Sequence, residues 1–226
     1  MNIIHLCSGK IGLSIVATGS CVICGGTKVH YNFSLGNFRI EECSACKLMR
    51  LAPQPSDAEL REIYGARYFL MSDDVSARNH VSDLKSATAD DYLTLIETEA
   101  ARPLTGDLLE IGCGQGEFLL RAAERGLSVT GLEYSPAAAA VAARRIGQRG
   151  RVVVGDISDA PSLGQSFDFI VFADVLEHVR DPRAFLRSVH SLLKPGGIAV
   201  IVVPNLDSLS AKLLGTSWME FKVEHL

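Results

Sequence analysis

The chain has 226 residues, 47% of them hydrophobic, which is enough apolar material for one ordinary folded domain and a small module and excludes a disordered polypeptide. Its formal net charge of −4 at pH 7 gives no overall field that attracts polyanions, so the composition argues against a nucleic-acid partner. No stretch approaches the roughly 20 apolar residues of a membrane helix, and we expect no membrane partner.

Residues 1–20 show no clear periodicity and are interpreted as a leader. Their apolar part, residues 11–17, is short and is interrupted by Gly12 and Ser14, so it fits a secretory signal poorly. Four of the six cysteines form two Cys-x-x-Cys pairs, whereas a secreted disulfide scaffold is smaller and denser in cysteine. These features predict a cytoplasmic protein whose paired cysteines bind metal.

The paired cysteines predict a zinc ribbon over residues 21–50. Two residues between thiolates let a tight turn direct both sulfurs at one ion, and two such turns complete a tetrahedral set. Four thiolates leave no position for water, so the zinc would be structural. The alternatives are four cysteines without metal, or a redox pair, which normally opens a helix beside a βαβ unit. The predicted zinc ligands are Cys21, Cys24, Cys43 and Cys46.

Residues 51–104 are predicted to form a helical connector. Ser56 and Glu59 make a capping box, which predicts a helix that runs toward Tyr64. A second helix is expected over residues 83–102, before a proline ends it.

From residue 105 onward, short apolar runs alternate with helical stretches, which is typical of a parallel sheet covered by helices. The strands are expected at residues 107–111, 128–133, 151–154, 167–173 and 198–203. The helices between them are expected at residues 117–125, 136–146 and 182–193. The stretch Pro195-Gly-Gly197 is expected to stop the last of these helices. Residues 105–226 are therefore interpreted as one α/β domain.

A glycine-rich loop joins the first of these strands to the first helix. Gly112, Gly114 and Gly116 alternate, so the backbone can bend sharply and approach a ligand without a Cβ in the way. Dinucleotide-binding loops space their last two glycines by two residues and place a pyrophosphate at the helix N-terminus. Here the spacing is one residue, and the carboxylate of Glu117 in the first helical turn would repel a pyrophosphate. The loop therefore favours an adenosine ligand without phosphates.

Acidic residues follow the next two strands. Glu133 ends the second strand, where a doubly wound fold presents a carboxylate to ribose hydroxyls. Asp156 follows the third strand and could accept a hydrogen bond from an adenine amino group. Each acid alone would also fit a solvated strand end or a helix cap. Their order along the chain, after the glycine loop, favours ligand binding.

These motifs, in this order, resemble those of class I S-adenosylmethionine-dependent methyltransferases. The matching stretches are Glu110-Ile-Gly-Cys-Gly-Gln-Gly116, Glu133, Gly155-Asp156, Asp174-Val-Leu-Glu-His178 and Leu193-Lys-Pro-Gly-Gly197. The paired cysteines, followed by Leu51-Ala-Pro-Gln-Pro-Ser56, Tyr64, Tyr68 and Phe69, resemble bacterial zinc-ribbon methyltransferases of sugar and natural-product pathways. The resemblance implies a Rossmann-like, doubly wound, mainly parallel α/β sheet. Five strands are visible here, and the sequence shows no counterpart of the last two of the usual seven. We therefore expect residues 105–226 to be a domain truncated at its C-terminus, either as a fragment or as a shortened protein with an incomplete substrate side.

The resemblance also implies how each motif would bind S-adenosylmethionine. The three glycines would face the methionine part, Glu133 would hold the ribose, and the residues at 156–157 would frame the adenine. The residues that end the fourth strand would lie near the sulfonium. The expected cofactor-binding residues are Glu110, Gly112, Gly114, Gly116, Glu133, Asp156, Ile157, Ala173 and Asp174.

Candidate catalytic groups lie at two places in the sequence. His178 follows Glu177 just after the fourth strand, at the edge where ligands bind, and is the best single candidate for a general base. A structural histidine that holds the loop is the alternative. Glu224-His225 resembles a Glu-His pair near the active site of sugar C-methyltransferases, although it lies near a chain end, where fraying is expected. Trp218 would pack on the last helix or contact substrate.

The predicted function is methyl transfer from S-adenosylmethionine to a small molecule, such as a nucleotide-linked sugar or another biosynthetic intermediate. The missing strands leave a second hypothesis, in which the domain binds the cofactor or a partner chain without turnover. A third is an RNA methyltransferase that grips RNA with its ribbon, against which the acidic composition argues. Neither the acceptor atom nor the oligomeric state follows from the sequence.

Overall fold

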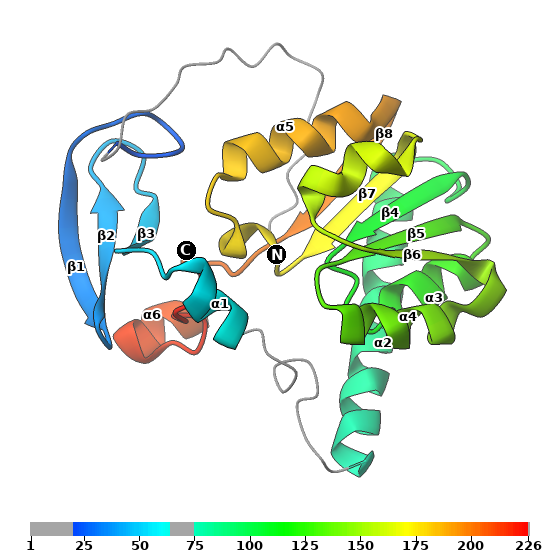
Figure 1. The fold of residues 1–226 in the computed structure, drawn as a ribbon, viewed down its shortest axis with the longest axis horizontal. Helices are drawn as coiled ribbons and strands as arrows, with labels where there is room; N and C mark the ends of the chain where they lie inside the picture. Colours follow the sequence, from blue (N-terminus) through cyan, green and yellow to red (C-terminus); the bar gives the residue numbers. More distant parts are fainter. Residues whose placement is uncertain (1–19, 64–74, 226) are drawn as a thin grey trace.

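The computed structural model describes residues 20–63 and 75–225. Within these ranges the chain forms a small three-stranded antiparallel sheet and a five-stranded parallel sheet flanked by helices (Figure 1). The leader, apart from Ser20, lies outside the described residues, as do Tyr64, Tyr68 and Phe69. Within the described ranges, no helix is long and apolar enough to cross a membrane.

The antiparallel sheet carries the paired cysteines. Its strands are β1 (Val29–Leu35), β2 (Phe38–Cys43) and β3 (Met49–Ala52), and β2 pairs with both neighbours. The first cysteine pair precedes β1, and the second pair lies in the turn between β2 and β3. We call residues 20–52 the ribbon; its third strand ends two residues beyond the module predicted from the cysteine spacing.

Two helices connect the ribbon to the parallel sheet. α1 (Asp57–Ile63) begins as predicted with a capping box: the Ser56 backbone N–H donates to Glu59 Oε2 at 2.7 Å, and the Glu59 N–H donates to Ser56 Oγ at 3.3 Å. α2 (Val75–Ala100) starts eight residues before the predicted helix. The sequence Ser72-Asp-Asp74 directly before this start consists of residue types that favour helix N-caps, a signal that the prediction did not use.

The parallel sheet has the strand order β6-β5-β4-β7-β8. Its strands are β4 (Asp107–Ile111), β5 (Ser128–Glu133), β6 (Gly150–Val154), β7 (Phe167–Ala173) and β8 (Leu193–Val202). The chain order is therefore reversed between β4 and β7, which is the switch point where doubly wound sheets bind ligands. The predicted Rossmann-like α/β fold with five parallel strands is confirmed.

Helices cover both faces of this sheet (Figure 1). α2, α3 (Glu117–Glu124) and α4 (Pro136–Ile146) pack together on one face. α5 (Pro182–Leu192) and the 3₁₀ segment Ile157–Leu163 pack on the other. Side chains alternate along each strand, so Leu108 joins the α2–α4 core while its neighbour Leu109 joins the α5 core. Two apolar cores hold the strand ends in fixed positions.

The last strand differs from its predicted start. β8 begins at Leu193 rather than at residue 198, because the stretch Pro195-Gly-Gly197 is an irregularity inside the strand. Its register against β7 jumps from the pair Phe167–Leu193 to the pair Phe169–Ile198. A Cβ at Gly197 would lie 3.0 Å from the Phe167 carbonyl oxygen, so the glycine permits this close approach.

The segment after β8 contains α6 (Leu209–Leu214) and the 3₁₀ turn Gly215–Ser217. Among residues 203–225 the structure shows no further strand, as the sequence predicted. This segment reaches back to the ribbon: the Phe221 ring contacts Phe33 of β1 edge-to-face, with ring centroids 4.8 Å apart. Trp218 packs on Phe221 in the same way at 5.6 Å.

Candidate functional site

The glycine loop between β4 and α3 has the conformation that its glycines predict. Gly112, Gly114 and Gly116 have φ angles of 72°, 53° and 81°, in the left-handed region that favours glycine. A Cβ at Gly116 would lie 3.0 Å from the Cβ of Ala142 in α4, and one at Gly112 would lie 2.6 Å from Val175 Cγ2. The loop therefore requires glycine for its backbone path and for close packing.

Glu133, at the end of β5, holds this loop. The backbone N–H of Gly114 donates to Glu133 Oε2, and that of Ser135 donates to Oε1, both at 2.8 Å. The residue is 3% exposed, and burial raises the pKa of its carboxyl while these backbone donors oppose the rise. A carboxylate has about four lone-pair positions, so both oxygens can still accept from a ligand.

A cavity of about 300 Å³ lies beside the glycine loop, at the carboxyl ends of β4 and β7. We call it the inner cavity. Five residues predicted to bind cofactor line it: Glu110, Gly112, Gly114, Ala173 and Asp174. Four others do not line it: Gly116, Glu133, Asp156 and Ile157. Asp156 is exposed and accepts from the Ser158 backbone N–H at 2.6 Å, which is a capping geometry.

The inner cavity contains acids whose pKa values are raised. Burial, with the nearby charges of Glu117 and Glu133, places the pKa of Glu110 well above its usual range. Within the described chain, Glu110 Oε2 is buried and has no hydrogen-bond partner. Burial also raises the pKa of Asp174, whose backbone φ of 52° turns the chain at the end of β7. This wall of the cavity suits a ligand that carries a positive charge or donates hydrogen bonds.

The expectation about Glu117 needs a correction. Its side chain forms an ion pair with Arg145 of α4 and accepts from Ser82 Oγ at 3.3 Å. Because Arg145 compensates the charge, Glu117 would repel a pyrophosphate less than the sequence suggested. The preference for an adenosine ligand without phosphates then rests on the glycine spacing and on the acids of the cavity.

The sequence analysis missed the contribution of α2. Lys85, Thr88 and Tyr92 of this helix line the inner cavity. Lys85 is close enough to Glu110 and Asp174 for its charge to oppose part of the rise in both pKa values. The residues Ala89, Leu93 and Ile96 form its buried face, at a spacing of four and three residues. That spacing was the available signal that α2 packs on the sheet rather than merely connecting two parts.

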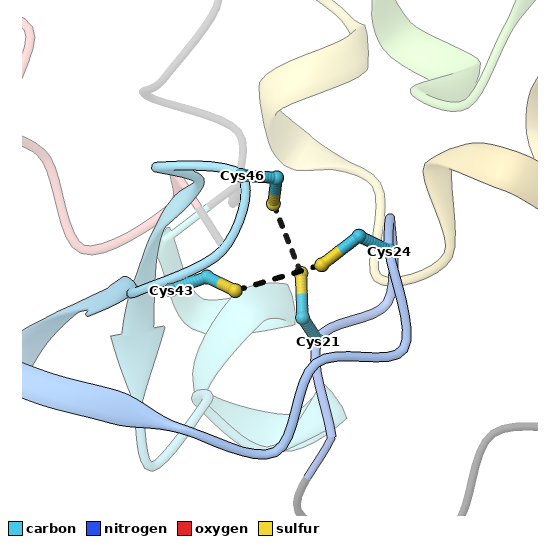
Figure 2. Close-up of side chains that lie close together, drawn as sticks. All are labelled: Cys21, Cys24, Cys43 and Cys46. Atoms are coloured by element: carbon cyan, nitrogen blue, oxygen red, sulfur yellow. Dashed lines mark hydrogen bonds between the residues drawn. The ribbon is translucent and has the colours of Figure 1, made fainter.

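The four ribbon cysteines converge as predicted (Figure 2). Their Sγ atoms lie within 4.8 Å of one another, and the Cys21–Cys46 and Cys24–Cys43 distances are 3.5 and 3.6 Å. Bonds of about 2.3 Å to a tetrahedral zinc would separate the sulfurs by about 3.8 Å. The backbone N–H groups of Cys46 and Ala45 lower the pKa of Cys43 to about 6, whereas burial and the neighbouring thiols raise that of Cys46 to about 12, so the support for a metal site comes from the convergence of the sulfurs. The cluster is compatible with a zinc ribbon.

The two predicted catalytic pairs meet in space. His178 follows Glu177 in the 3₁₀ turn Leu176–His178, and its Nδ1–H donates to the backbone carbonyl of Glu224 at 3.0 Å. The rings of His178 and His225 are in edge-to-face contact, with centroids 4.8 Å apart and an interplanar angle of 82°. Glu224 therefore contributes its carbonyl oxygen here. Residues 46 or more positions apart form one cluster.

Burial sets the protonation of this cluster. It lowers the pKa of His178, and it lowers that of His225 to about 4 with help from the neighbouring His178. It also raises the pKa of Glu177 to about 7, aided by Asp174. Asp174 thus lies beside the cluster and also lines the inner cavity. Near pH 7 both imidazoles are neutral, which is the form a general base requires.

A second cavity of about 1050 Å³, here called the outer cavity, lies between the ribbon, the β7–α5 loop and the C-terminal segment. Glu177, His225 and Trp218 line it, as does Cys46 of the ribbon. Arg50 of β3 also lines it, and so do Arg180, Arg183 and Arg187 of the β7–α5 loop and α5. The spacing of three and four residues among the last three places them on one side of the start of α5, a signal that the sequence analysis did not use.

Polar contacts at the outer cavity join the β7–α5 loop and α5 to the ribbon and to the start of α1. Arg180 Nη2 donates to the Pro55 carbonyl at 2.6 Å and to Asp57 Oδ1 at 2.9 Å. Arg183 Nη1 donates to the Ile23 carbonyl at 3.3 Å. The ribbon is thereby held against the loop that carries Glu177 and His178.

Known proteins with similar sequences are methyltransferases. Residues 82–226 match the model of a family described as a methyltransferase domain. The ubiquinone biosynthesis O-methyltransferase of Cereibacter sphaeroides strain ATCC 17025 is 32% identical over 142 residues, which cover 57% of this chain and 58% of that protein. The corresponding enzyme of Ruegeria pomeroyi is 37% identical over 113 residues, 48% of this chain and 46% of its own. The chain thus spans about half the length of these curated relatives.

A solved structure shares the fold. The magnesium protoporphyrin IX methyltransferase of Synechocystis PCC 6803, solved with bound SAH, aligns with a TM-score of 0.55 at 17% identity and covers 71% of this chain and 77% of its own. An amino pentose methyltransferase of Micromonospora echinaspora, solved with bound SAM, aligns with a TM-score of 0.49 at 30% identity over 57% of this chain and 56% of its own. With the family model matched over residues 82–226, the chain belongs to the methyltransferase domain family.

Proposed function

We propose that the chain binds S-adenosylmethionine in the inner cavity and transfers its methyl group to a small molecule held in the outer cavity. One observation carries this proposal: Asp174, which lines the inner cavity, lies close enough to Glu177, which lines the outer cavity, for its charge to raise the pKa of Glu177. A methyl transfer needs a donor and an acceptor held in line, and good orientation is worth about 7–11 kcal/mol.

The described residues fit the cofactor. The glycine loop offers backbone without Cβ atoms, and the carboxyl groups of Asp174 and Glu110 supply oxygens that can accept hydrogen bonds from the ammonium of the methionine part. Lys85 would pair with the carboxylate of the methionine part. Glu133 would hold the ribose through its remaining lone pairs, and Asp156 with Ile157 would frame the adenine at the next strand end. The bound cofactor would supply an electrophilic methyl group.

The residues of the outer cavity would handle the acceptor. His178 would remove a proton where the acceptor must lose one, because its Nδ1–H is held by the Glu224 carbonyl and Nε2 is then the basic nitrogen. His225, packed on its ring, and Glu177 would complete the site. Such a base contributes about 10²–10⁴-fold to the rate.

The chemistry of the outer cavity favours an anionic acceptor. Arg180, Arg183 and Arg187 line one wall, and guanidinium groups match carboxylate and phosphate geometry. A nucleotide-linked sugar fits this charge and the volume, and so do other phosphorylated or carboxylated biosynthetic intermediates. The curated relatives act, by name, in ubiquinone biosynthesis, and the amino pentose enzyme in calicheamicin biosynthesis. These names are consistent with a small-molecule acceptor for this chain.

We further propose that the four cysteines hold one structural zinc, which fixes the wall of the outer cavity through Cys46 and its neighbours in β3. In this proposal the chain has three parts: the ribbon with its zinc, a helical connector, and a cofactor-binding domain from residue 105 onward.

The test has two stages. Calorimetry should detect binding of S-adenosylmethionine and of its demethylated product, and no binding of either at millimolar concentration would contradict the proposal. A labelled methyl group should then pass to an acceptor in a metabolite extract. Binding without transfer would favour the second candidate, a cofactor-binding module.

A further inference from the structure

Glu177, His178 and His225 form a cluster whose composition is that of a metal site. One ligand atom of each lies within 4.8 Å of those of the other two. Two imidazoles and one carboxylate are a ligand set that binds divalent transition metals and leaves coordination positions open. This set is separate from the four ribbon cysteines, which are all thiolates.

The orientation of His178 supports this interpretation. Its Nδ1–H is held by the backbone carbonyl of Glu224 at 3.0 Å, so Nε2 is the nitrogen that can bind a metal. Histidines that ligate metals almost always donate their other ring N–H to a carbonyl or carboxylate in this way, which fixes both the tautomer and the ring plane. The edge-to-face contact with His225 fixes the second ring against the first.

The carboxylate of Glu177 supplies an independent observation. Both of its oxygens are buried, and neither has a hydrogen-bond partner among the described residues. A buried carboxylate without donors is costly, whereas a cation that it coordinates compensates the lost hydration. Lys222 lies close enough to lower the pKa of Glu177, but burial dominates.

We propose that Glu177, His178 and His225 bind one divalent transition metal ion in the wall of the outer cavity, with open coordination positions for an oxygen of the acceptor. Glu177 and His225 both line that cavity, so these positions are accessible to a molecule within it. A bound metal would occupy Nε2 of His178, so the metal-bound form is an alternative to the form in which this nitrogen acts as a base. The proposal goes beyond methyl transfer, because metal binding requires neither S-adenosylmethionine nor turnover.

The experiment uses the full chain with its ribbon first saturated with zinc. Cobalt(II) is then added, because it binds imidazole and carboxylate ligands and follows zinc in affinity for the occupied thiolate site. Calorimetry should show uptake of one cobalt per chain, with visible absorption bands of a bound ion. Cobalt should also broaden the imidazole proton resonances of His178 and His225, which locates the ion without any substitution.

Two variants and two matched controls test the ligands. Glu177→Gln keeps the shape of the side chain but removes its charge, and His225→Ala removes one imidazole; each should weaken cobalt binding at least tenfold. Glu124→Gln changes an exposed acid of α3, and His190→Ala an exposed histidine of α5; neither should change the affinity more than about twofold. An unchanged circular dichroism spectrum and thermal unfolding midpoint show that each variant is folded.

The outcomes separate this proposal from the proposed function. A parent protein that takes up no cobalt beyond its zinc overturns the metal site, whatever its methyl-transfer activity. Cobalt uptake that is unchanged in both Glu177→Gln and His225→Ala overturns it as well. Failure to bind S-adenosylmethionine would instead contradict the proposed function and leave the metal site intact.

Discussion

The inner and outer cavities are built in different ways. The inner cavity is formed largely by strand ends and the loop that follows β4, with one wall from α2. The outer cavity brings together the ribbon, the β7–α5 loop and the C-terminal segment, and its contacts join residues more than 120 positions apart. A site at strand ends is therefore supported by the core of one domain, whereas the outer cavity depends on how separate segments dock.

This difference in construction predicts that cofactor binding and acceptor binding respond differently to changes in the ribbon. The inner cavity is fixed by two apolar cores and by backbone hydrogen bonds to Glu133, so its shape should survive changes in the ribbon. The outer cavity should change with anything that moves the ribbon relative to α5. Each prediction below should affect one cavity and spare the other.

The largest effect is expected from loss of the zinc site. Cys43→Ser should release the metal and loosen residues 20–52, since the apparent binding free energy of a structural zinc is about 10–16 kcal/mol and is largely folding free energy. Hydrogen exchange should show lost protection in the ribbon and retained protection in β4–β8. Methyl transfer should disappear while the affinity for S-adenosylmethionine stays within about threefold.

Cys113→Ala is the matched control for this prediction, because Cys113 is a buried cysteine of the glycine loop outside the ribbon. It should retain about one zinc per chain. Elemental analysis that finds no metal in freshly purified, reduced parent protein would contradict the zinc assignment.

His178→Ala should lower turnover by about 10²-fold or more while leaving the cofactor affinity within about threefold. The neutral ring is the active base, and burial lowers its pKa below the usual 6.5. Turnover should therefore rise with pH through a limb that lies below pH 6.5. Steady-state rates measured across pH, together with calorimetry, would check both statements.

His190→Ala, an exposed position on α5, is the control and should turn over like the parent. Normal turnover by His178→Ala would move the base elsewhere, and His225 would be the next residue to replace. Replacement of His225 alone should also disturb the packing of the His178 and His225 rings.

Glu133→Ala should weaken the affinity for S-adenosylmethionine by at least about tenfold. Each hydrogen bond to a charged acceptor is worth roughly 1.5–3 kcal/mol, and 1.4 kcal/mol is one decade in affinity. The variant also frees the amides of Gly114 and Ser135, so the glycine loop loses its support. Calorimetry measures the effect, with Glu124→Ala at the exposed end of α3 as the control. Unchanged binding would show that Glu133 does not hold the ribose.

Arg180→Ala should have the smallest effect. Its ion pair with Asp57 joins two exposed side chains, and such pairs contribute about 0.2–1 kcal/mol. The KM for the acceptor should rise about two- to fivefold, since the outer cavity loses one closing contact, while cofactor affinity stays unchanged. Arg149→Ala, an exposed position far from α5 in the sequence, controls for the lost charge. An unchanged KM would show that acceptor binding does not depend on this contact.

The sequence by itself determined the parallel sheet and the converging cysteines. Alternating apolar runs and helical stretches located all five strands, because buried strands in such sheets are continuously apolar and their connections are short. The alternating glycines predicted the loop conformation, since left-handed φ angles select glycine. These features depend on residues close together in the chain.

Only the tertiary structure decided which distant groups meet. The pairing of His178 with His225, the wall formed by Lys85 and Tyr92 of α2, and the ion pair of Glu117 with Arg145 all depend on packing between separate elements. The raised pKa of Glu177 follows from burial, which a single sequence does not show residue by residue. Periodicity specifies which face of an element is apolar, but the position of each side chain opposite its partner is fixed only when the faces pack.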